Sequence, residues 1–273
     1  MKNITRTISF VMTSVFISAA PATIRAASSG DDAVHAHSAL AQLQRANALW
    51  DKIHRATSEH ERRDAVRATW ECLAAIPAAW PDDANAVVQS GILRYELASE
   101  VGMTQSGIDA LLEVEPLAPR TPLATDVERR LGEAYVLQGD TRAAEIHFRT
   151  AERALRADAN AVEAGALLLS AGGFYAQQHN IAEAIRLFDR GAEWPGAWIA
   201  SRIQFRLSAA RAAVRLEDES RRDIAVRELG ALDELIIAGR SNPVTSADGI
   251  AAESAAREAS RIRQELDVVP FDR

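Results

Sequence analysis

The sequence predicts an all-α protein built as a stack of antiparallel helix hairpins. Alanine dominates the apolar residues, with leucine, arginine and glutamate frequent around it, and these residues lose little on entering a helix. Alternating Val, Ile and Thr runs of the kind that form strands are almost absent after residue 30. The three tyrosines of the chain, Tyr95, Tyr135 and Tyr175, lie 40 residues apart. A fixed spacing in this range indicates stacked structural repeats.

The first segment is typical of a secretory signal peptide. A positively charged start is followed by an apolar run over 8–20 and by small residues that place cleavage between Ala22 and Ala26. We therefore predict a signal peptide over 1–26, a flexible lead-in over 27–35, and a periplasmic or secreted protein. No cysteine near the cleavage region offers a site for a lipid anchor. The apolar run is too short to span a bilayer, so we expect no membrane span after cleavage.

Residues 36–240 are expected to form the helix-hairpin array. The outer hairpins are predicted from amphipathic patterns. Their helices cover 36–56, 59–76, 198–216 and 220–238. A C-terminal helix over 246–268 carries small and aliphatic residues on one stripe, namely Ala252, Ala255, Ala259, Ile262 and Leu266. We expect this helix to cap the last repeat, because a stack of repeats exposes its end to water.

The central segment carries a recognisable order of residues. Over 125–158 the order is Leu131-Gly132, Tyr135, Gly139, Ala144, Phe148 and Ala151. This order resembles the tetratricopeptide repeat (TPR) pattern of a Leu-Gly pair, a Tyr, a turn Gly, and then Ala, an aromatic residue and Ala on the second helix. Over 165–198 the match recurs at Gly172, Tyr175, Ala184 and Phe188, with His179 in place of the turn Gly. The resemblance implies a right-handed superhelical stack, a TPR-like α-solenoid.

The period and the turns add detail to this prediction. Tetratricopeptide units are about 34 residues long, and we assign the surplus here to a longer second helix over 141–157. Gly139 is expected to end the first helix in a left-handed conformation, and Asp140 to cap the next. Asn180 and Glu183 are expected to form a capping box at the corresponding helix start.

The resemblance also implies where a partner binds. In this family the first helix of each hairpin lines a concave surface that holds a protein or peptide. The positions of this chain that follow the tyrosine register are Gln89, Leu93, Glu96, Arg129, Glu133, Val136, Leu137, Leu169, Gly173, Ala176 and Gln177. This mixture of apolar and weakly charged side chains would suit an extended or helical peptide segment. Our first hypothesis is an extracytoplasmic protein-interaction scaffold in an envelope complex, and not an enzyme.

Several features are interpreted as parts of the fold. The pairs Arg129-Arg130 and Arg221-Arg222 are interpreted as solvated helix faces. The single cysteine, Cys72, excludes an internal disulfide and is interpreted as a small buried hydrophobe. Trp194 and Trp198 fill the gap between two repeats or, alternatively, offer exposed anchors for a partner. The Gly172-Gly173 pair is attributed to close helix contact.

No catalytic motif, cofactor loop or zinc-protease helix is found. The formal charge is −7 and no basic block stands out, so no nucleic-acid partner is expected. The one group that suggests a metal ligand set is Asp31, Asp32, His35 and His37, which we interpret as part of the polar lead-in; no metal or cofactor is predicted. Two alternatives stay open, an envelope hydrolase or lyase on a helical frame, and a periplasmic solute- or metal-binding protein.

Overall fold

The computed structural model describes residues 38–216, 220–241 and 246–268, and over these ranges the chain is helical without a strand. The α-helices are α1 (Ala39–Arg55), α2 (Glu59–Ala74), α3 (Ile76–Ala79), α4 (Ala84–Val101), α5 (Thr104–Val114), α6 (Ala124–Gln138), α7 (Thr141–Ala154), α8 (Ala161–Gln177), α9 (Ile181–Ala192), α10 (Ile199–Ala213), α11 (Ser220–Ser241) and α12 (Ser246–Val268). A 3-10 helix, η1 (Glu115–Arg120), follows α5. The predicted signal peptide, the lead-in and the Asp31 to His37 segment lie outside the described residues.

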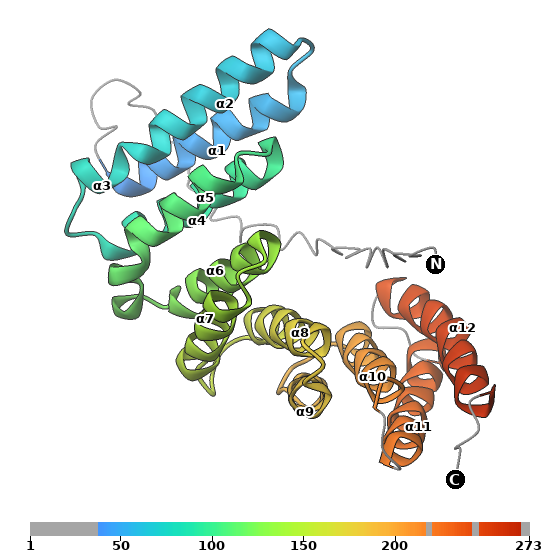
Figure 1. The fold of residues 1–273 in the computed structure, drawn as a ribbon. Helices are drawn as coiled ribbons and strands as arrows, with labels where there is room; N and C mark the ends of the chain where they lie inside the picture. Colours follow the sequence, from blue (N-terminus) through green and yellow to red (C-terminus); the bar gives the residue numbers. More distant parts are fainter. Residues whose placement is uncertain (1–37, 217–219, 242–245, 269–273) are drawn as a thin grey trace, which may run out of the picture. The chain divides into compact units, whose positions relative to one another are not determined.

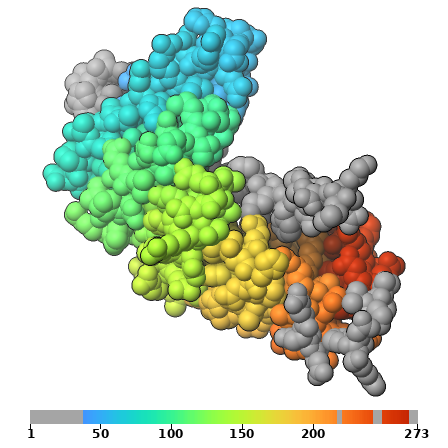
Figure 2. Space-filling model, in the orientation of Figure 1, coloured from blue at the N-terminus to red at the C-terminus, as the bar shows by residue number. Residues whose placement is uncertain are grey.

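The helices pack as neighbouring pairs (Figure 1). The hairpins are α1 with α2, α4 with α5, α6 with α7, α8 with α9, and α10 with α11, while α12 packs on both α10 and α11. In the space-filling view each coloured segment borders the next one along the chain (Figure 2). The predicted fold class, an all-α stack of helix hairpins, is confirmed. None of the described helices combines the length and the apolarity that a membrane crossing needs.

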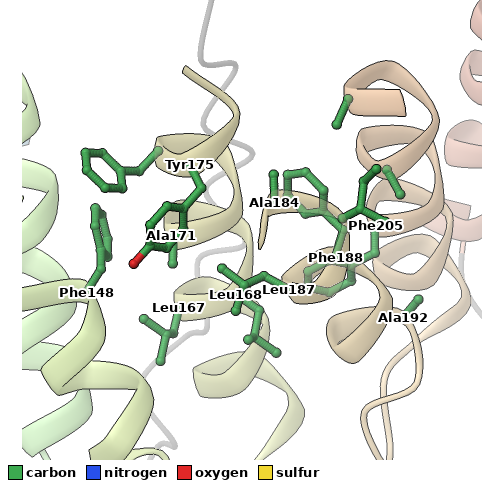
Figure 3. Close-up of a cluster of buried hydrophobic side chains, with 14 of the residues drawn as sticks. Phe148, Leu167, Leu168, Ala171, Tyr175, Ala184, Leu187, Phe188, Ala192 and Phe205 are labelled. Atoms are coloured by element: carbon green, nitrogen blue, oxygen red, sulfur yellow. The ribbon is translucent and has the colours of Figure 1, made fainter. Parts of the chain in front are cut away.

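The repeated glycines and phenylalanines meet across each hairpin. A Cβ atom placed on Gly172 would lie 2.5 Å from Cε1 of Phe188, and one on Gly132 would lie 3.0 Å from Cδ1 of Phe148. Each glycine therefore makes room for the ring of the partner helix. Phe148 and Phe188 belong to one buried cluster that runs from α7 to α11, in which leucines and alanines fill the space between the rings (Figure 3).

The turns of the two central hairpins share one backbone conformation. Gly139 has φ of 78° and Asp140 caps α7, its side chain accepting a hydrogen bond from Ala143 N at 2.9 Å. His179 takes the place of the turn glycine and still adopts φ of 59°, a left-handed conformation that is unfavourable for a residue with a Cβ. Asn180 caps α9 as predicted.

Two local predictions are wrong. The Glu183 side chain bonds to Arg186 at 2.9 Å instead of completing the capping box. The second helix of the central repeat ends at Ala154 rather than continuing to 157. Leu155 turns its backbone to the extended region and buries its side chain in the core, and Asn160 caps α8. The surplus over the tetratricopeptide period therefore includes the connection between hairpins.

The remaining aromatic and thiol groups divide between core and surface. Cys72 is buried, as predicted, and burial raises the pKa of its thiol, which keeps it protonated at neutral pH. Trp194 is half-buried and its Nε1 donates to the carbonyl of Ala159 at 3.2 Å. Trp198 is 55% exposed at the start of α10. Trp194 therefore links the two connections that flank the α8–α9 hairpin, while Trp198 is largely open to solvent.

Candidate partner-binding face

The first-helix residues predicted from the resemblance lie on α4, α6 and α8, and polar contacts join these three helices. Arg130 on α6 donates to Glu96 on α4, with Nη2 to Oε1 at 2.5 Å. Ser170 on α8 donates to Glu133 on α6, with Oγ to Oε1 at 2.5 Å. Helices α6 and α8 also pack directly on one another. Three successive hairpins are thus linked along one set of helices.

Arg129 and Arg130 form the centre of this network, which corrects their interpretation as a solvated face. Arg129 binds Asp126 at 2.5 Å and Glu133 at 2.6 Å, and its side chain is only 13% exposed. Arg130 binds Asp126 at 2.9 Å. Burial raises the pKa of the Asp126 carboxyl, but Arg130 and Arg129 together lower it further, so its pKa lies below its usual value. Arg129 and Glu133 therefore stabilise the stack and are not free charges.

The other predicted face residues differ in exposure. Leu137 is 77% exposed at the end of α6. Gln89 and Gln177 are also exposed. The half-buried apolar members are Leu93, Val136, Leu169 and Ala176, all packed at the edge of the core. A Cβ on Gly173 would meet nothing within 4 Å, so close helix contact explains Gly172 but not Gly173. This face combines rigid ion pairs with accessible apolar surface.

A groove of about 560 Å³ between α2 and the end of α4 is a second candidate surface, which the sequence did not indicate. Three arginines and three glutamates line it together with apolar side chains; the charged residues are Arg62, Arg63, Arg67, Glu59, Glu71 and Glu100. The charges of the lining balance, so the groove favours no charge in a partner, while Trp70, Val101 and Met103 offer apolar contacts. The first-helix face has no residue in common with this groove.

A partly buried polar cluster, which we name the His-Glu cluster, consists of Glu115, Glu128 and His147. His147 Nδ1 lies 2.8 Å from Glu128 Oε2 and 4.0 Å from Glu115 Oε1. The His147 ring stacks on Tyr135, with centroids 5.2 Å apart and planes 9° apart. Burial and then the charge of Glu128 raise the pKa of Glu115, while His147 opposes them. This cluster was not predicted from the sequence, because its members come from three separate elements, η1, α6 and α7.

Comparison with known proteins gives limited similarity. No family model matches the chain, and no curated protein matches it. Among solved structures, the crystal structure of MamA protein is similar, at 14% sequence identity over 74% of this chain and 96% of that chain, with a TM-score of 0.49. The class of protein is defined by the chain's own helices and glycine–phenylalanine contacts, an all-α hairpin repeat with a TPR-like fold. Membership of the tetratricopeptide family stays a prediction.

Proposed function

We propose that the chain is an extracytoplasmic scaffold of an envelope complex, which binds a protein partner on the first-helix face of α4, α6 and α8. The observation that carries this proposal is the combination found on that face. The Arg130–Glu96 ion pair joins α6 to α4, and the Ser170–Glu133 hydrogen bond joins α8 to α6. Beside these contacts lie apolar side chains, of which Leu137 is exposed and Val136 and Leu169 are half-buried. A preorganised surface with accessible apolar groups binds a segment at low entropic cost.

The chemistry of the face favours a protein or peptide partner over nucleic acid. Its two arginines are already paired with Asp126, Glu133 and Glu96, and the chain as a whole carries a formal charge of −7. Phosphate binding needs unpaired cations. The face also offers no catalytic arrangement, since its carboxylates are neutralised by arginine. The proposed role is therefore binding without catalysis.

The proposal includes export and the division of the chain. The signal peptide over 1–26 is removed, the array covers 36–240, and the helix over 246–268 closes its end. Mass spectrometry of the protein recovered from the periplasmic fraction should find an N-terminus within a few residues of Ala22 to Ala26. An intact Met1 on protein confined to the cytoplasm would contradict export.

Photo-crosslinking in cells tests the binding face. A photoreactive amino acid is placed at Leu137 on α6 or Gln177 on α8, and as matched controls at Ile146 on α7 or Val226 on α11, both 55% exposed. We expect the same protein to be captured from both first-helix positions and from neither control. Equal capture from all four positions, or none from the first two, would contradict the proposal. A fifth probe at Met103, which is 44% exposed, reports on the α2–α4 groove, and capture from this position alone would assign binding to that groove instead.

Affinity for the captured partner gives a second test. Leu137→Asp should weaken binding at least about tenfold, because an exposed apolar contact is replaced by a charge. Ile146→Asp is similarly exposed in the same hairpin but lies on the second helix, and it should leave the affinity within about twofold. Both side chains are exposed, so neither change is expected to unfold the protein.

A further inference from the structure

The His-Glu cluster occupies positions that the next repeat fills with leucine. Shifted by the 40-residue period, Glu115, Glu128 and His147 correspond to a set of core leucines. These are Leu155, Leu168 and Leu187, at 8%, 0% and 0% exposure, all in one buried cluster. Leu168 and Leu187 lie next to one another in Figure 3. The fold therefore accepts an apolar cluster at this site, and packing alone does not explain the polar one.

The two carboxylates of the cluster lack the arginine partners that another buried carboxylate of the protein has. Glu228, which is fully buried, binds both Arg206 and Arg227. The ion pairs among the described residues give Glu115 and Glu128 no arginine or lysine partner, and their one basic neighbour is the imidazole of His147. Two carboxylates beside one imidazole leave net negative charge in a partly desolvated place, which is costly unless a cation neutralises it.

The geometry of the three side chains is suited to a metal ion. One ligand atom from each residue lies within 4.8 Å of the other two. Two ligands bound at zinc distances and a tetrahedral angle are about 3.3 Å apart, and the separations of 2.8 and 4.0 Å from His147 Nδ1 lie on either side of that value. Stacking on Tyr135 fixes the imidazole, while Glu128 is 7% exposed. Two of the three ligands are thus held in place before binding, and Glu115, which is partly exposed, can adjust to the ion.

We propose that Glu115, Glu128 and His147 bind a divalent transition-metal ion of the Zn²⁺ class, which joins η1, α6 and α7. One imidazole nitrogen with two carboxylate oxygens favours Zn²⁺, Co²⁺ or Mn²⁺ over Mg²⁺ and Ca²⁺, which prefer oxygen ligands alone. Three protein ligands leave a coordination position for water or for a group of a partner. The ion would connect the hairpin of α4 and α5 to that of α6 and α7. This site is independent of the partner-binding face.

Zinc titration of the full protein tests the proposal. The protein is stripped with EDTA, returned to chelator-free buffer near neutral pH, and titrated with ZnCl₂ in a calorimeter, with MgCl₂ and CaCl₂ in parallel. We expect one Zn²⁺ per chain with a Kd of about 1 µM or tighter. At free zinc of about 100 times Kd, the melting temperature should rise by about 5–10 °C. No saturable zinc binding, or equal binding of Mg²⁺, would overturn the proposal.

Variants locate the ion. Glu115→Gln and Glu128→Gln should each weaken zinc binding at least about tenfold and remove most of the thermal shift. Glu115 is half-exposed, so its variant should remain folded even if the Glu128 variant does not. Glu100→Gln is the matched control, since Glu100 pairs with the exposed His54 at 3.5 Å, and it should bind zinc as the native chain does. His35→Ala/His37→Ala should also retain the site. If instead this double variant lost zinc binding while Glu115→Gln kept it, the proposed site would be wrong.

Discussion

The hairpin of α6 and α7 and the hairpin of α8 and α9 have the same packing but different polarity. Both place a glycine of the first helix under a phenylalanine of the second, and both use a left-handed residue at the turn. The first helices differ most clearly in charge. Asp126, Arg129 and Glu133 on α6 correspond to Ala166, Leu169 and Gly173 on α8. The shared glycine and phenylalanine therefore build each hairpin, whereas α6 carries an ion-pair network that α8 lacks.

The largest change in stability is expected when a residue of the α8–α9 hairpin replaces its counterpart in the α6–α7 hairpin. Arg129→Leu introduces the residue found 40 positions later, and it should lower the free energy of unfolding by about 3 kcal/mol, because Asp126 and Glu133 lose a buried partner. Urea unfolding measures the change. Arg149→Leu removes an arginine whose side chain is 65% exposed, and it should leave stability nearly unchanged. If Arg129→Leu also left stability nearly unchanged, the buried network would add no stability.

The shared glycine contact should be the next most sensitive feature. Gly172→Ala forces a Cβ against Phe188 and should cost about 2 kcal/mol; Gly132→Ala meets a longer contact and should cost about 1 kcal/mol. Gly173→Ala, one residue further along α8, adds a Cβ in open space and should stabilise the helix by about 0.5–1 kcal/mol. A loss at Gly173 as large as at Gly172 would mean that the contact with the Phe188 ring does not determine the cost at Gly172. Thermal unfolding separates the three variants.

The two hairpins differ at the turn, where one has Gly139 and the other His179, and this difference should have the smallest effect on stability. His179→Gly removes a Cβ from a left-handed residue and should stabilise the protein by about 0.5 kcal/mol, or about 1–2 °C in melting temperature. Gly139→His makes the opposite change in the other hairpin and should destabilise it by about 1 kcal/mol. If both changes moved the melting temperature in the same direction, the two turns would not be equivalent.

Much of the fold could be predicted from the sequence because it depends on local and periodic signals. Asp140 and Asn180 cap helices through atoms a few residues away, and the tyrosine spacing reveals the repeat directly. The end of α7 was missed because Leu155 leaves the helix to reach the core, and helical propensity does not report such a tertiary contact.

The charged sites were harder to predict. The burial of Arg130 depends on Glu96, a neighbour 34 residues away in the sequence, and that of Glu133 depends on Ser170, 37 residues away. The His-Glu cluster joins residues from three elements. The sequence carried one signal of the cluster: its three residues are polar at positions where the following repeat has leucines. A comparison of the two repeats position by position would have found it.

The most direct test of the account replaces the cluster by the leucines of the next repeat, Glu115→Leu/Glu128→Leu/His147→Leu. Thermal and urea unfolding are measured with EDTA and with zinc. With EDTA the variant should fold and be about 1–4 kcal/mol more stable than the native chain, as is found when buried charges are replaced by packed apolar groups. Its melting temperature should not respond to zinc, whereas that of the native chain should rise. A variant less stable than the native protein in EDTA, or one that keeps the zinc response, would contradict the conclusion that these three polar side chains bind a metal ion and are not needed for the packing of the repeats.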